Sequence, residues 1–114
     1  MANYQNIIPK QLAQAAVTGS YATIYTVPSD PPTRTVVKDI TVINTSGAAI
    51  GIYISFVPLA GTAGTANALF YNNSIPANTT MQWCGSQVMD SGGFISVKAS
   101  TTGCTITVSG GEGT

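Results

Sequence analysis

Residues 34–58, RTVVKDITVINTSGAAIGIYISFVP, decide the fold of this chain. Both halves of the stretch are rich in β-branched residues, and from Ile50 to Phe56 every second residue is large and apolar, which is typical of a strand with one buried face. The Asn-Thr-Ser-Gly cluster between the halves is typical of a turn. We therefore expect two strands at 34–44 and 50–58, joined as a hairpin.

The same alternation continues toward the C-terminus. In residues 94–100 and 104–109 apolar side chains alternate with polar ones, and Thr101-Thr102-Gly103 between them predicts a second hairpin. Further strands are predicted at 22–27, 68–75 and 79–89. About seven short strands at even spacing indicate an all-β domain, a single antiparallel β-sandwich or jelly roll.

The two ends of the chain lack this pattern. Residues 9–17, PKQLAQAAV, have the composition of two helical turns with proline at the first position, and a helix this short needs packing against something. We therefore expect an N-terminal arm at 1–17, a sandwich domain at 18–110 and a flexible C-terminal tail at 111–114. The apolar side chains of the arm are the expected assembly contacts, namely Ile7, Ile8, Leu12 and Val17.

Charge is scarce throughout the 114 residues. Only 7% of them are charged, four basic and four acidic, where about 25% is usual. Binding to nucleic acid or to an anionic membrane requires clustered Lys and Arg, so neither partner is expected. A neutral surface with few charges also weakens repulsion between copies, which favours a protein that works in an assembly.

The motif Asp90-Ser91-Gly92 resembles the active-site turn of an aspartic peptidase. That chemistry needs two neighbouring carboxylates, so the site would have to form across a homodimer, and the 24 residues after Asp90 are too few to build the rest of such an enzyme. We interpret the motif as a turn between strands. The chain has no histidine, which removes Ser-His and Cys-His catalysis, so we expect no enzyme, no metal and no cofactor.

The cysteines, Cys84 and Cys104, fall on two predicted strands. A bridge between them would close a loop of about 20 residues and contribute about 3 kcal/mol in the chain-entropy model. The N-terminal sequence has no basic segment followed by an apolar run, so synthesis is expected to end in the reducing cytoplasm. Two buried free thiols are therefore the favoured interpretation, with the bridge as the alternative.

Aromatic residues offer a second alternative for function. Exposed rings of Tyr53, Tyr71 and Trp83 would suit a sugar-binding platform, in a groove that Tyr21, Tyr25 and Phe70 would also line. Such residues are more often part of the core and rim of a sandwich.

Two segments carry a family resemblance, TIYTVPSDPPTRTVVKDITVINTSG at 23–47 and IPANTTMQWCGSQVMDSGGFISVKASTTGCTITVSG at 75–110. Their order of strand ends and turns resembles small β-sandwich virion proteins of tailed bacteriophages, over roughly residues 12–110. Members of that family commonly have Gly-Asp before the last hairpin, and this chain departs from that pattern at Met89-Asp90-Ser91.

The resemblance implies a non-enzymatic structural protein of the virion, which stabilises or decorates the head, collar or tail. It also implies synthesis in the host bacterial cytoplasm and contacts with copies of itself, as a trimer or higher ring, and with other virion proteins. The alternative function is a carbohydrate-binding adhesin module of a phage particle.

Overall fold

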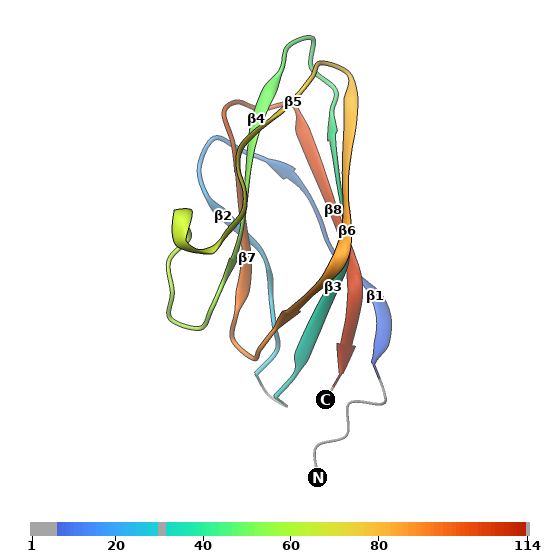
Figure 1. Cartoon of the computed structure of the whole chain (residues 1–114), viewed down its shortest axis with the longest axis vertical. Helices are drawn as coiled ribbons and strands as arrows, with labels where there is room; N and C mark the ends of the chain where they lie inside the picture. Colours follow the sequence, from blue (N-terminus) through green and yellow to red (C-terminus); the bar gives the residue numbers. More distant parts are fainter. Residues whose placement is uncertain (1–6, 30–31, 114) are drawn as a thin grey trace.

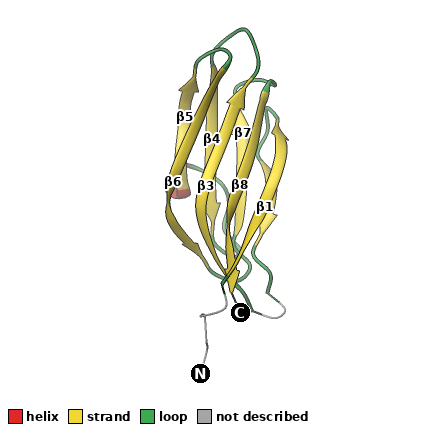
Figure 2. Cartoon of the chain, turned by 90° about the vertical axis from the view of Figure 1, so that its right-hand side faces the viewer, coloured by secondary structure: helices red, strands yellow, loops and turns green. Residues whose placement is uncertain are grey.

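The structure, a computed structural model, describes residues 7–29 and 32–113. Two antiparallel sheets of four strands face each other (Figure 1, Figure 2), which confirms the predicted all-β sandwich. Sheet A contains, in order, β1 (Ile8–Val17), β8 (Cys104–Gly113), β3 (Arg34–Asn44) and β6 (Thr79–Met89). Sheet B contains, in order, β2 (Ala22–Thr26), β7 (Phe94–Ala99), β4 (Ile50–Val57) and β5 (Ala68–Ile75), and a short 3-10 helix, η1 (Thr65–Asn67), precedes β5.

The chain changes sheet at every connection except the one from β4 to β5, which is the topology of an eight-stranded jelly roll. Both predicted hairpins are therefore wrong, since β3 and β4 lie in different sheets, as do β7 and β8. Alternation tells which face of a strand is buried but does not tell which strand lies beside it. The five residues 45–49 are enough to cross the gap of about 10 Å between packed sheets.

The N-terminal segment is a strand and not the expected helical arm. β1 pairs antiparallel with β8, from Ile8 opposite Glu112 to Val17 opposite Cys104. Its alanines and glutamines favour a helix locally, and pairing with the open side of β8 overrides that preference. The sandwich therefore includes residues 8–17, and residues 1–6 of the predicted arm lie outside the described residues.

The predicted C-terminal tail is wrong in the same way, because β8 continues to Gly113 and lies between β1 and β3. A Cβ on Gly110 would lie 2.0 Å from the carbonyl oxygen of Val36, so glycine is needed for β3 to approach this closely. The glycines that suggested flexibility therefore permit a close strand contact. Thr114 lies outside the described residues.

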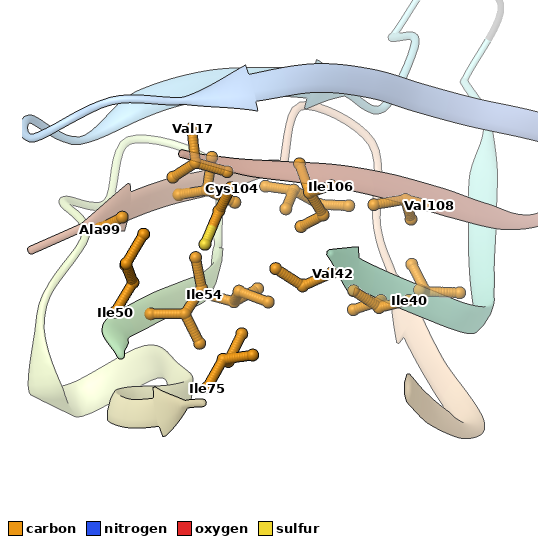
Figure 3. Packing of buried hydrophobic residues seen from close by; sticks show 14 of the residues in the cluster. Val17, Ile40, Val42, Ile50, Ile54, Ile75, Ala99, Cys104, Ile106 and Val108 are labelled. Carbon is orange, nitrogen blue, oxygen red and sulfur yellow. The ribbon is translucent and has the colours of Figure 1, made fainter. Parts of the chain in front are cut away.

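The core fills the space between the sheets. Isoleucine and valine side chains from both sheets point toward one another (Figure 3). The inward-facing alternation predicted for β4, β7 and β8 is confirmed, and the fully buried isoleucines include Ile52, Ile54, Ile95 and Ile106.

The upper end of the sandwich in Figure 1 is held by a buried asparagine. The Nδ2 group of Asn44 donates to the carbonyl oxygens of Ala48 at 2.9 Å, Ile75 at 2.9 Å and Pro76 at 3.2 Å. Its Oδ1 accepts from the backbone amide of Ser46 at 2.9 Å and from the Ser46 hydroxyl at 2.8 Å. This Asn44 cluster fixes the β3–β4 and β5–β6 connections to each other.

The lower end is held by a network that contains an ionisable pair. The Tyr25 hydroxyl on β2 donates to Glu112 on β8 and lies 2.7 Å from the Thr35 hydroxyl on β3. Lys10 on β1 donates to Glu112 Oε1 at 3.1 Å. This Tyr25 network therefore joins sheet B to three strands of sheet A.

Candidate assembly surfaces

The Asp90 motif is a turn, as interpreted from the sequence, and joins β6 to β7. Gly92 has a φ of 82°, and the Ser91 hydroxyl accepts from the amide of Thr33 at 2.9 Å and donates to its carbonyl oxygen at 2.8 Å. Asp90 Oδ1 lies 3.0 Å from Nε of Arg34, and the Asp90 side chain is 79% exposed. The carboxylate therefore stands at the surface in an ion pair.

Within residues 7–29 and 32–113, no three His, Cys, Asp or Glu side chains come together to hold a metal ion. In the same ranges no helix is long and apolar enough to cross a membrane.

The two cysteines lie on different faces of sheet A and are both free. Cys104 is buried, and burial raises the pKa of its thiol. Cys84 is exposed, so the expectation that it is buried is wrong. Cys84 lies opposite Asp39 of β3, and Cys104 lies opposite Asn44 of the same strand. Asp39 and Asn44 are five residues apart, a distance of roughly 17 Å along a strand. A bridge within one chain is therefore excluded by geometry.

Three tyrosines gather on the outer face of sheet B around a lysine. The rings of Tyr53 and Tyr71 lie 5.0 Å apart between centroids, and those of Tyr53 and Tyr21 lie 6.4 Å apart, both edge to face. Lys98 Nζ lies 4.4 Å from the Tyr53 ring and 4.9 Å from the Tyr21 ring, at the distance of a cation–π contact. We call these four residues the tyrosine cluster.

A β-bulge shapes the tyrosine cluster. Between Ile52 and Ile54 only Tyr53 stands opposite Tyr71 and Asn72, and Asn72 has a φ of 52°. The extra residue turns the side chain of Tyr71 outward, where it is 57% exposed.

Trp83 does not belong to the tyrosine cluster, so the platform predicted from three aromatic residues is only partly formed. Trp83 lies opposite the fully buried Ile40 and packs against the core, with its ring 6.4 Å from that of Phe56. It therefore covers the open side of the sandwich between β6 and sheet B. Lys98 was not predicted as a member of the cluster, because its place beside Tyr53 depends on strand pairing, which alternation does not reveal.

The predicted assembly residues divide into two pairs. Leu12 packs against the core and Val17 is buried, so these two are used within their own chain. Ile7 and Ile8 are 45% and 65% exposed and are available to a neighbour.

Ile7 also lines a groove on the outer face of sheet A. The groove has a volume of about 280 Å³, and its wall and floor include Pro9, Val36, Gly110 and Gly111. This groove was not predicted, because it depends on β8 continuing as a strand through Gly110 and Gly111, at the expected boundary between the sandwich and the tail.

No family model and no curated protein sequence matches this chain. Solved structures do match its fold. One is the structure of infectious bursal disease virus Gx strain, with 11% identity and a TM-score of 0.51, covering 95% of this chain and 32% of that chain.

A second match is the crystal structure of the T13 infectious bursal disease virus particle, with 10% identity and a TM-score of 0.50, covering 97% of this chain and 31% of that chain. This chain therefore spans about one third of the length of the viral chains it matches. At this identity the likeness is one of fold alone, and the jelly roll of this chain is similar to part of those viral chains.

Proposed function

We propose that this chain is a non-enzymatic structural protein of a virus particle, ordered by contacts with copies of itself and with other virion proteins. The observation that carries the proposal is the eight-strand jelly roll, which matches a virus structure over 95% of the chain. Jelly rolls are common in viral capsids and also occur in lectins and enzymes, so the surface must support the choice.

The surface supports a structural role. The possible catalytic motif, the Asp90 turn, has its carboxylate in an exposed ion pair with Arg34. Charged residues make up 7% of the chain, so the repulsion that keeps soluble monomers apart is weak. Large apolar side chains are exposed on both sheets, among them Ile8, Ile43, Tyr71 and Val88. Such a surface favours association.

The finer placement that we propose is a tailed bacteriophage, where the chain stabilises or decorates the head, collar or tail as a trimer or higher ring. This placement rests on the sequence resemblance at 23–47 and 75–110. It implies synthesis in the bacterial host cytoplasm and incorporation into the virion. The exposed Ile7 and Ile8 remain the proposed assembly contacts of the N-terminal segment.

The experiment is electron microscopy of the purified protein over a range of micromolar concentrations. We expect closed rings or shell fragments of uniform symmetry. A protein that stays monomeric, and that also fails to bind purified particles, would contradict the structural role.

A carbohydrate-binding adhesin module is the second candidate, and the tyrosine cluster is the observation that favours it. Exposed aromatic rings with a cation nearby suit an acidic sugar. On a glycan array, this function requires binding that Tyr71→Ala removes. Trp83, which packs against the core, no longer belongs among the platform residues.

A further inference from the structure

β6 is a long edge strand that carries neither charge nor proline. In the part of the chain that the structure describes, β6 pairs with β3 and has no strand on its other side (Figure 2). Its eleven residues, TTMQWCGSQVM, contain no charged residue and no proline. Soluble proteins usually protect an edge with charge, proline, a bulge or short length, because the free N–H and C=O groups otherwise pair with another chain.

The other three edges carry such protection. β1 contains Pro9 and Lys10. β2 is five residues long, and its pairing with β7 contains a register shift. β5 has two register shifts and the left-handed Asn72. β6 instead keeps six consecutive regular pairs, from Thr79 to Cys84, before its one register shift.

We propose that β6 is the edge through which a second copy of this chain binds, antiparallel and about a two-fold axis, so that sheet A continues into the partner's sheet A. The proposal rests on the self-association in the proposed function and names its contact. In a two-fold pairing the residue on the axis meets its own copy, so a charged residue there would oppose a like charge. β6, having no charge, avoids that penalty.

The strand pattern also selects a register. Met81 and Trp83 lie opposite the buried Val42 and Ile40, so both point inward, and Gln82 between them points outward. The inner face of one sheet continues into the inner face of the other only when residues of the same face meet, because a slip of one residue reverses every side chain.

A two-fold axis at Gln82 satisfies this rule within the regular segment. It places Met81 of each copy opposite the partner's Trp83, so two equivalent sulfur–aromatic contacts form. Each contact buries further two side chains that are half-buried in the single chain. The two Gln82 side chains then lie beside each other at the axis, and each keeps its own bond, since Gln82 Nε2 donates to both carboxylate oxygens of Asp39 at 3.2 Å. Thr80 comes to lie opposite the partner's Cys84.

The first test places lysines on the edge. Thr80 and Gln82 are both exposed, so the double variant Thr80→Lys/Gln82→Lys should fold normally. We expect its self-association, measured by sedimentation equilibrium, to be weaker than that of the wild type by about tenfold or more. The matched control is Gln14→Lys/Ala16→Lys, two exposed positions on β1, the rival edge of sheet A, and this control should associate like the wild type.

The second test probes the register. Under mild oxidation Thr80→Cys should give a covalent dimer linked to the partner's Cys84, and Thr80→Cys/Cys84→Ser should give much less. A dimer that forms equally well without Cys84 would overturn the register.

The outcomes separate this inference from the proposed function. Association that survives the β6 lysines, or that the β1 lysines abolish instead, overturns the β6 edge and leaves the structural role standing. A wild-type chain that does not associate at any concentration overturns both the edge and the self-association. Association only with another virion protein overturns the β6 homodimer alone.

Discussion

The two ends of the sandwich are held by different chemistry. At the upper end the Asn44 cluster is neutral and is centred on one fully buried side-chain amide, which bonds to both connections. At the lower end the Tyr25 network depends on the carboxylate of Glu112, which is partly exposed and paired with Lys10. The comparison shows that one fold can combine a closure that is insensitive to pH with one that is sensitive to it.

The pKa values at the lower end give the sign of this sensitivity. Burial of Glu112 raises its pKa, and the hydrogen bonds from Tyr25 and Lys10, with the Lys10 charge, outweigh burial, so the net pKa is lowered. Burial, followed by the hydrogen bond to Glu112, raises the pKa of Tyr25 above its usual range. Acid should therefore loosen the lower end through Glu112, and strong alkali should loosen it through Tyr25.

The largest expected effect is at the upper end. Asn44→Ala removes the partner of three backbone carbonyl groups, and we expect a loss of about 3 to 5 kcal/mol in the free energy of unfolding, equal at pH 4 and pH 7. Because Cys104 pairs with Asn44 across the strands, its alkylation should also accelerate, while Cys84 reacts readily in both proteins.

Urea unfolding and thiol alkylation followed by mass spectrometry measure both effects. Asn73→Ala is the control, because this asparagine of β5 is exposed and its Nδ2 donates to a weak acceptor, Met81 Sδ, at 2.9 Å, and we expect a change within about 0.5 kcal/mol. A loss from Asn44→Ala as small as this control would show that the cluster does not hold the upper end.

Tyr25→Phe should have the second largest effect. It removes a hydrogen bond to a charged group, which is worth about 1.5 to 3 kcal/mol. The tyrosine contribution is fully present below the unfolded pKa of about 10 and is lost as pH rises above it, because the folded pKa is higher. In thermal unfolding, the wild type and Tyr25→Phe should therefore converge above pH 10. Curves that stay parallel there would contradict the assigned role of the hydroxyl.

Glu112→Gln tests how the stability of the lower end depends on acid pH. The stabilisation from the lowered pKa of Glu112 is present above the unfolded pKa of about 4.3 and is lost as pH falls through the folded value. The variant should lose about 1 kcal/mol at pH 7 and lose less than the wild type between pH 5 and pH 2. Thermal unfolding across this range is the measurement, and an unchanged acid slope would contradict the network.

The smallest effect is expected at Asp90, which also lies at the lower end. Asp90 forms an ion pair with Arg34 in which both side chains are exposed. Asp90→Asn should therefore change the free energy of unfolding by less than about 1 kcal/mol. Peptidase activity at acid pH that disappears in this variant would contradict the interpretation of the motif as a turn.

Alternation predicted the strand faces well and the strand partners poorly. From Ile50 to Ile54 the buried side chains are the ones expected from period-two alternation, whereas beyond Ile54 the pattern fails, because Ser55 is buried and Phe56 is half-buried. The β3–β4 connection was expected to form a hairpin, because the turn residues at 45–49 are the same whether the chain returns to its own sheet or crosses to the other.

The predictions for the two ends of the chain were wrong for a related reason. β1 has helix-favouring alanines and β8 ends in glycines, so local composition gave no indication of β1 or of the last residues of β8. Both are formed by pairing with residues about 100 positions away, as in Ile8 opposite Glu112. The tyrosine cluster and the groove beside Ile7 depend on these same pairings, which is why only some of their residues could be predicted.

The most direct test of the proposed structural role is quantitative mass spectrometry of purified particles of the virus to which we assign this chain. We expect the chain to be present in many copies per particle, in a fixed ratio to the major capsid protein, and to remain after extensive washing. A chain that is abundant in the infected-cell lysate and absent from the particles would contradict the account.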